Sequence, residues 1–156
     1  MSRFNRLLDA TFTPPRRWVL NTALSFDGDW LNEEEIAQLK SIGVRINTKG
    51  KVTVSKGFDT DLASVPRFAW AFIAPFDIAR AAVIHDYLYS KIRDYRADCA
   101  QSDVAEDAEL IKDCKVAADT MFLEGMKVSE PKVAPWKIWA AHRSVVMFGN
   151  GSIVPR

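Results

Sequence analysis

The feature that most constrains this chain is an ionisable pair, His85-Asp86, inside the otherwise apolar stretch AAVIHDYLY at residues 81–89. Upstream of it, the segment TDLASVP at residues 60–66 carries another carboxylate, Asp61, in a loop marked by serine and proline. Ionisable groups are costly to bury unless they are paired. The fold must therefore give this pair partners or use it in chemistry.

The composition is that of a globular protein. With 156 residues, 48% of them hydrophobic and 26% charged, we expect one soluble domain over residues 1–156. The net charge of +1 comes from dispersed lysines and arginines, so we expect no nucleic-acid partner. Residues 1–8 lack the apolar run of a signal peptide, and the longest apolar run, residues 68–76, is too short to cross a bilayer. We therefore expect no membrane partner.

Metal, cofactor and nucleophile signals are weak. Cys99 and Cys114 show neither disulfide nor zinc spacing, which indicates reduced thiols in a cytoplasmic compartment. Adjacent helical residues such as His85 and Asp86 diverge by about 100° and rarely bind one ion together. Ser64 is not in a Gly-x-Ser-x-Gly motif, and the glycines occur singly. We expect no metal and no cofactor.

The first half of the chain has mainly β patterns. Residues 17–26 resemble one strand that ends at a turn. Residues 44–47 and 51–55 alternate apolar and polar residues around a glycine turn, which predicts a hairpin. Between them, Asn32 followed by Glu35 predicts a capping box and a short helix over residues 33–42.

The second half has helical periodicity. It predicts helices over about residues 77–93 with Asp77 as N-cap, 102–128 and 131–148, and Ser64 before Val65-Pro66 resembles a helix start. We expect an α+β fold in which a small antiparallel sheet from the N-terminal half packs against three or four C-terminal helices.

Helical geometry places three ionisable side chains on apolar faces. His85 shares a face with apolar neighbours one turn away, Asp119 lies on the apolar stripe of the next helix, and His142 lies on that of the last. The three side chains therefore point inward from separate helices, and they can meet.

Two interpretations of these residues remain open. In the first, Asp61, His85, Asp86 and Asp119 form a catalytic centre, in which the imidazole moves a proton and a carboxylate orients it. Candidate binding residues are then Ser64, Arg67 and His142. In the second, His85 and Asp119 satisfy each other, or cap the loop at residues 59–64, and hold the fold together by buried hydrogen bonds.

Two further features have alternative explanations. The acidic residues between 94 and 113 are either the solvated face of a long helix or an acidic docking surface. Trp136 and Trp139 are either a ligand platform or anchors of a core or an interface.

Four segments of the chain resemble a known family. They are GFDTDLASVPR at residues 57–67, AAVIHDYLY at residues 81–89, Ala118-Asp119 followed by Phe122, and a final Phe148-Gly149. Over about residues 44–149 the chain resembles domain of unknown function thirteen fifty-three, a small domain of tailed phages and prophages. The resemblance implies a phage-encoded protein and brings no established activity.

The chain departs from the family pattern in one region. It carries extra residues between Lys91 and Lys115, so we expect a helical insertion near residues 93–114. Lys115 stands where the family usually has arginine, which puts the geometry of a charge-paired centre in question.

Three functions are compatible with the sequence. The first is a structural or virion-associated phage protein, a tail or head component, located in the virion or in the host cytoplasm before assembly. Its partners would be other phage structural proteins or further copies of itself. The second is a small hydrolase that acts on a cell-wall or nucleotide substrate through its His/Asp centre. The third is a host-directed inhibitor that acts by binding.

Overall fold

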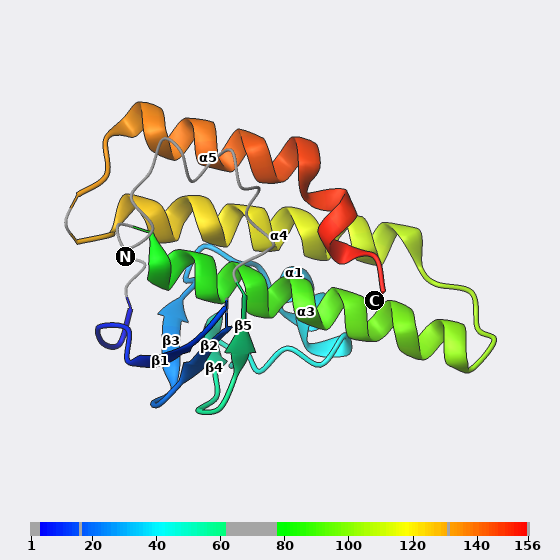
Figure 1. The fold of residues 1–156 in the computed structure, drawn as a ribbon. Coiled ribbons are helices and arrows are strands. Elements are labelled where there is room, and N and C mark those ends of the chain that lie inside the picture. Colours follow the sequence, from blue (N-terminus) through cyan, green and yellow to red (C-terminus); the bar gives the residue numbers. More distant parts are fainter. Residues whose placement is uncertain (1–3, 16, 62–77, 131, 156) are drawn as a thin grey trace.

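A computed structural model describes residues 4–15, 17–61, 78–130 and 132–155. It confirms the predicted α+β class: small antiparallel sheets from the N-terminal half lie against long C-terminal helices (Figure 1). The elements are β1 (Ala10–Thr13), β2 (Arg17–Leu20), β3 (Leu24–Asp27), α1 (Glu33–Ser41), β4 (Lys51–Val54), β5 (Asp59–Thr60), α3 (Ala79–Gln101), α4 (Ala108–Lys127), α5 (Pro135–Phe148) and the 3₁₀ helix η1 (Gly149–Ile153).

The single strand predicted over residues 17–26 is two strands in different sheets. β2 lies in a three-stranded sheet of order β1-β2-β5, whereas β3 pairs with β4. The break follows Leu20, where Asn21 turns its side chain back to β1. Its amide donates to Asp9 Oδ1 over 2.9 Å, and its carbonyl oxygen accepts from Thr11 Oγ1 over 3.0 Å. These bonds hold the chain where it leaves one sheet for the other.

The predicted hairpin of residues 44–47 and 51–55 is present, although only its second segment is a full strand, β4. Backbone hydrogen bonds from Asn47 N to Lys51 O and from Thr53 N to Arg45 O flank a bridge between Ile46 and Val52. Asn47 closes the turn, because its side-chain oxygen accepts from the backbone N–H groups of Lys49 and Lys51, each over 2.9 Å. On its other edge, β4 pairs with β3 along its whole length.

Helix α1 begins as predicted. Asn32 Oδ1 accepts from Glu35 N over 2.9 Å, and Glu35 Oε2 accepts from Asn32 N over 2.9 Å, which completes the capping box. The helix stops before Gly43, which adopts a φ of 90° that favours glycine.

The long helices differ from the prediction at their ends. α3 continues to Gln101, and the helix predicted over residues 102–128 is divided, because residues 102–107 connect α3 to α4. Asp103 has a φ of 54° and interrupts the helix, and Asp107 caps α4 by accepting from Glu109 N and Leu110 N. α5 starts at Pro135 rather than residue 131, with proline in its first turn. The predicted helix start at Ser64 and N-cap at Asp77 lie outside the described residues.

The N-terminal half of α3 is the centre of the core. Its residues from Ala79 to Tyr89 are buried on almost every side, apart from the half-buried Arg80, because the helix lies between the sheets and α4 (Figure 1). α4 in turn lies between α3 and α5. Gly125 permits the close approach of α4, since a Cβ there would lie 2.9 Å from the Ala81 Cβ. Among the described helices, none is long and apolar enough to span a membrane.

Candidate functional site: a buried polar cluster between three helices

His85 faces the core, as the helical pattern predicted. Its side chain is 0% exposed and contacts the tilted rings of Tyr89 and Phe122, whose centroids lie 4.0 and 4.9 Å from that of the imidazole. Its Nε2 lies 2.8 Å from Asp119 Oδ1. Since an ionised carboxylate only accepts hydrogen bonds, Nε2 carries the proton and Asp119 selects this tautomer.

Asp119 joins three side chains. Besides His85 Nε2, its Oδ1 accepts from Tyr89 Oη over 2.6 Å, and its Oδ2 accepts from Lys115 Nζ over 2.8 Å. We call these four residues, His85, Tyr89, Lys115 and Asp119, the polar cluster. The hydrogen bonds are charge-assisted, and such bonds are the stronger kind in a buried setting.

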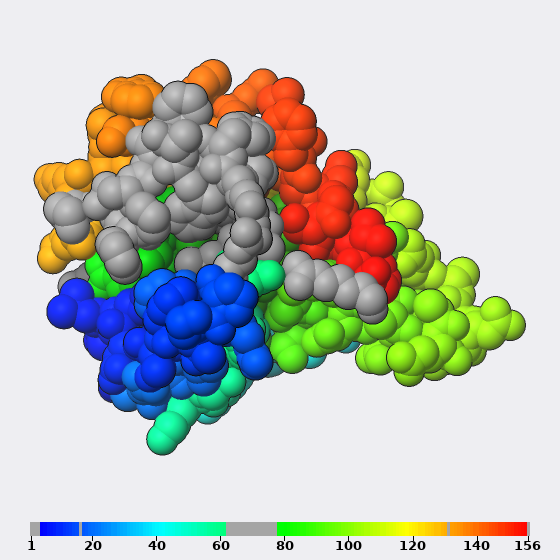
Figure 2. Space-filling model, viewed as in Figure 1, coloured from blue at the N-terminus to red at the C-terminus, as the bar shows by residue number. Residues whose placement is uncertain are grey.

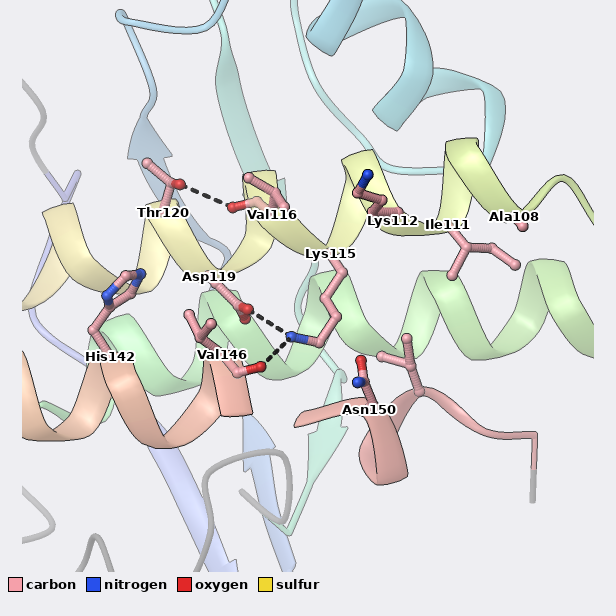
Figure 3. A pocket seen from close by; sticks show the side chains of 11 residues that line it. Ala108, Ile111, Lys112, Lys115, Val116, Asp119, Thr120, His142, Val146 and Asn150 are labelled. Atoms are coloured by element: carbon pink, nitrogen blue, oxygen red, sulfur yellow. Dashed lines mark hydrogen bonds and ion pairs between the residues drawn. The ribbon is translucent and has the colours of Figure 1, made fainter. Parts of the chain in front are cut away.

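Lys115 extends the polar cluster to α5. Its Nζ also donates to the backbone carbonyl of Val145 over 3.1 Å and to that of Val146 over 3.4 Å. Figure 3 shows the contact with Val146. The three donors of the ammonium are thereby used. The carbonyls belong to the last turn of α5, the negative end of that helix, where a cation is favoured. The lysine in the usual arginine position thus keeps the charge pair with Asp119.

The ionisation of the polar cluster follows from these contacts. Burial raises the pKa of Asp119, but the hydrogen bond and charge of His85 and the hydrogen bonds of Lys115 and Tyr89 outweigh it, and the net shift is downward. Burial, and then the charge of Asp119, raises the pKa of Tyr89. At neutral pH the cluster therefore holds an ionised carboxylate and a protonated phenol.

Asp86 is buried but belongs to a different contact. Its Oδ2 accepts a hydrogen bond from Thr60 Oγ1 at the end of β5, and its Oδ1 has no hydrogen-bond partner within the described parts of the chain. Asp86 thus ties α3 to the strand before the loop, on another side of the helix from His85. Asp61 is exposed beside Thr60. Ser64 and Arg67, the predicted binding residues of this loop, lie outside the described residues.

His142 lies near the polar cluster without a hydrogen bond to it within the described chain. It is half-buried on α5 and points towards α4 (Figure 3). Burial is the main cause that lowers its pKa, which keeps the imidazole neutral at physiological pH. The prediction that the three inward residues meet therefore holds for His85 and Asp119, with His142 on the adjoining wall.

A groove of about 490 Å³ opens between α4, α5 and η1. Lys115 and Asp119 line it, with His142 and Asn150 on the α5 and η1 side (Figure 3). Most of its other lining is apolar, including Ile111, Val116 and Val146. The groove therefore gives solvent access to the Lys115 side of the polar cluster, whereas His85 lies behind it.

Gly149 explains part of the final Phe148-Gly149 motif. A Cβ at this position would lie 2.3 Å from Tyr89 Oη and 3.2 Å from its ring. Only glycine lets the end of α5 approach the phenol this closely. The turn after α5 is therefore shaped around the polar cluster.

Sequence reasoning missed three members of the buried polar contacts: Tyr89, Lys115 as a direct partner, and Thr60. Tyr89 follows His85 by four residues, so the two side chains lie on the same face of α3. Lys115 precedes Asp119 by four residues, so these two lie on the same face of α4. This spacing was the available signal. Thr60 had none, because its contact with Asp86 joins residues far apart in the chain.

The arrangement favours stability over catalysis. The imidazole is enclosed, and both carboxylate oxygens of Asp119 are occupied. Within the described residues, no group of three histidine, cysteine or carboxylate side chains is placed to hold a metal ion. Cys99 and Cys114 are free and buried, and burial followed by the charge of Asp113 raises the pKa of Cys114 to about 12, which disfavours a reactive thiolate.

The fold and the polar cluster define a class: a small α+β domain whose three long helices are joined through a buried Lys–Asp–His–Tyr cluster. The family described as Protein of unknown function (DUF1353) matches residues 39–145, and the chain belongs to this family. The match contains all four residues of the polar cluster. No curated protein and no solved structure matches the chain.

Proposed function

We propose that this chain is a phage-encoded, virion-associated protein, a tail or head component, that acts through protein–protein contacts. Its motifs resemble a phage and prophage family, which supports the origin. One observation supports the contact role: an outward apolar face on α5. We define this α5 face by Trp139, Arg143, Val146 and Met147.

The α5 face is unusually apolar for solvent-facing helix surface. Its four residues fall within about 100° of arc on the helix. Trp139 is 65% exposed, Met147 59% and Val146 41%. Tryptophan, methionine and arginine are enriched where proteins meet, and contiguous exposed apolar surface marks such sites. The prediction of tryptophans as interface anchors thus has support at Trp139.

The hydrolase hypothesis has less support. A general base needs its imidazole within reach of a substrate, directly or through one water. His85 is enclosed, and its protonated nitrogen already bonds Asp119. Asp61 and Asp86 also make no hydrogen bond to the polar cluster within the described residues. A host-directed inhibitor would use the same α5 face, and the location of the protein separates it from a virion component.

Mass spectrometry of purified particles tests the proposal. The protein should be present in a fixed ratio to a known structural protein of the same particle. A phage that encodes Trp139→Asp should assemble particles with less of the protein, whereas Lys56→Glu, an exposed change in the connection between β4 and β5, should have no effect. Absence of the wild-type protein from particles would remove the proposal, and capture of a host protein instead would favour the inhibitor.

A further inference from the structure

Two regions of this chain have local excesses of charge, opposite in sign. Residues 94–113 contain seven acidic and two basic residues, whereas residues 131–156 contain four basic and no acidic residues. The acidic region is the end of α3, the connection to α4 and the start of α4. The basic region includes α5. A net charge of +1 is therefore compatible with an acidic end of the molecule and with a helix, α5, that carries two basic residues, Lys137 and Arg143, and no acidic residue.

The acidic end presents an apolar residue. We call residues 102–107 the tip; it projects from the body of the molecule beyond the ends of the helices, in yellow-green at the edge of Figure 2. Val104 in the tip is 59% exposed and follows Asp103. Exposure of this apolar side chain to water is unfavourable. An apolar residue beside a carboxylate is complementary to a surface that is apolar and carries a positive charge.

The tip is held in place. Arg96 donates to both carboxylate oxygens of Glu106, over 2.8 and 3.0 Å, and Tyr95 Oη accepts from Asp107 N over 3.0 Å. These bonds fix the end of the tip nearest α4 to α3. A docking element that is already ordered loses less conformational entropy on binding.

The α5 face has the complementary properties. Arg143 lies in the middle of the face, 5.9 Å from the Trp139 ring centroid, and pairs with no acidic side chain among the described residues. Val146 connects the face to the groove, where Val116 is also exposed. The face therefore offers an apolar recess beside an unneutralised cation.

A symmetric pairing of two α5 faces fits these charges poorly. If two copies of α5 packed antiparallel about Arg143, the two guanidinium groups would meet. Like charges placed together in an interface are unfavourable. The acidic tip avoids this repulsion, because it supplies both a carboxylate and an apolar side chain.

We propose that the α5 face and its groove bind the tip of a second copy of this chain, with Val104 in the groove and Asp103 facing Arg143. The contact joins different surfaces of the two copies, so it generates a ring if the rotation closes and an open chain if it does not. This inference rests on the proposed contact role, for which it names the partner.

Charge reversal separates this arrangement from others. We expect the wild-type protein to self-associate with rising concentration in analytical ultracentrifugation. Arg143→Glu and Asp103→Lys should each weaken this association by about tenfold or more, because like charges then face each other. An equimolar mixture should associate again, since it contains one wild-type interface and one reversed interface.

Control variants test whether a loss of association comes from misfolding or from a charge change elsewhere on the surface. Lys56→Glu makes the same charge change as Arg143→Glu, in the connection between β4 and β5. Those strands lie on the opposite side of α3 from α5 (Figure 1), so this change should leave association unchanged. Asp103 has a positive φ that asparagine also adopts readily, so Asp103→Asn removes the charge without strain. Val104→Ala should weaken association while the thermal midpoint stays the same, because the side chain is exposed.

Three outcomes would overturn the inference: a wild-type protein that stays monomeric at its highest soluble concentration, variants that associate like the wild type, or a mixture that fails to recover. Each is distinct from failure of the proposed function. If the protein is found in particles but is monomeric when pure, the proposed function stands and the proposed contact between copies is wrong. If the protein self-associates but is absent from particles, the contact between copies stands and the proposed function is wrong.

Discussion

Replacing Asp119 by alanine removes the acceptor that holds the polar cluster together. The carboxylate accepts from His85 over 2.8 Å, Tyr89 over 2.6 Å and Lys115 over 2.8 Å. Alanine leaves three donors without this acceptor, one of them a buried ammonium. Removal of one member of a buried ion pair typically costs about 3–5 kcal/mol, because the remaining charge is uncompensated.

The cost should be visible in thermal and chemical unfolding. For a protein of this size, about 1 kcal/mol corresponds to about 2–4 °C in the thermal midpoint, so we expect Asp119→Ala to melt about 6–20 °C lower. Urea unfolding followed by tryptophan fluorescence measures the free energy directly. Asp113→Asn is the matched control on the same helix, since it removes an exposed negative charge but keeps an oxygen that can accept from Gln38 Nε2, and it should change stability by no more than about 0.5 kcal/mol.

A double variant tests whether charge burial is the cause. Lys115→Met removes the uncompensated ammonium, so the combination of Asp119→Leu with Lys115→Met should be more stable than the sum of the single changes implies. We expect a coupling of about 1–3 kcal/mol. A loss below about 1 kcal/mol for Asp119→Ala, or no coupling, would refute a structural role for the ion pair.

The pH dependence has a defined sign. The pKa of Asp119 is lower in the folded protein, because His85, Lys115 and Tyr89 together outweigh the effect of burial. Its stabilising effect is therefore fully present above the unfolded pKa of about 3.9 and is lost as pH falls through the folded pKa. Asp119→Asn should flatten the loss of stability in this acidic window. An unchanged acid profile in urea titrations would contradict the assignment.

Three further changes have clear expected outcomes. Gly149→Ala places a methyl group against Tyr89 and should cost about 1–3 kcal/mol in urea unfolding, whereas Gly151→Ala, which meets nothing within 4 Å, should stay within about 0.5 kcal/mol; equal effects would contradict the packing at the end of α5. Asn32→Ala removes half of the capping box and should cost about 1 kcal/mol, and no change in chemical denaturation would show that the cap is dispensable. His85→Ala should lower the thermal midpoint because it empties an enclosed site and leaves Asp119 Oδ1 with one donor fewer, whereas a catalytic role would require lost activity at an unchanged midpoint.

Together, these contacts give His85 and Asp119 a structural role among the described residues. The polar cluster connects α3, α4 and α5 by buried hydrogen bonds. Lys115 reaches two elements at once, since it pairs with Asp119 on α4 and donates to carbonyls of α5. A buried hydrogen-bonded network of this kind restricts how helices can slide past one another. This gives a structural reason for His85 and Asp119, whereas the proposed contact role depends on the exposed α5 face.

Several features of the protein were determined by local sequence. The period of 3.6 residues identified His85 and Asp119 as inward-facing, and both are buried and bonded to each other. Asn32 and Glu35 identified the start of α1, because a capping box involves only neighbouring residues. In each case the signal and the structure lie within one helix or at its end.

Other features were decided only by the tertiary structure. The strand predicted from Arg17 divides between two sheets, β4 pairs with β3 on the edge opposite residues 44–47, and Thr60 bonds Asp86 across 26 positions. Gly149 is glycine because of Tyr89, sixty residues earlier in the chain. Periodicity shows which face of an element is buried, but it carries no information about which other element covers that face. That choice depends on packing and hydrogen bonds between distant segments, and these exist only once the chain has folded.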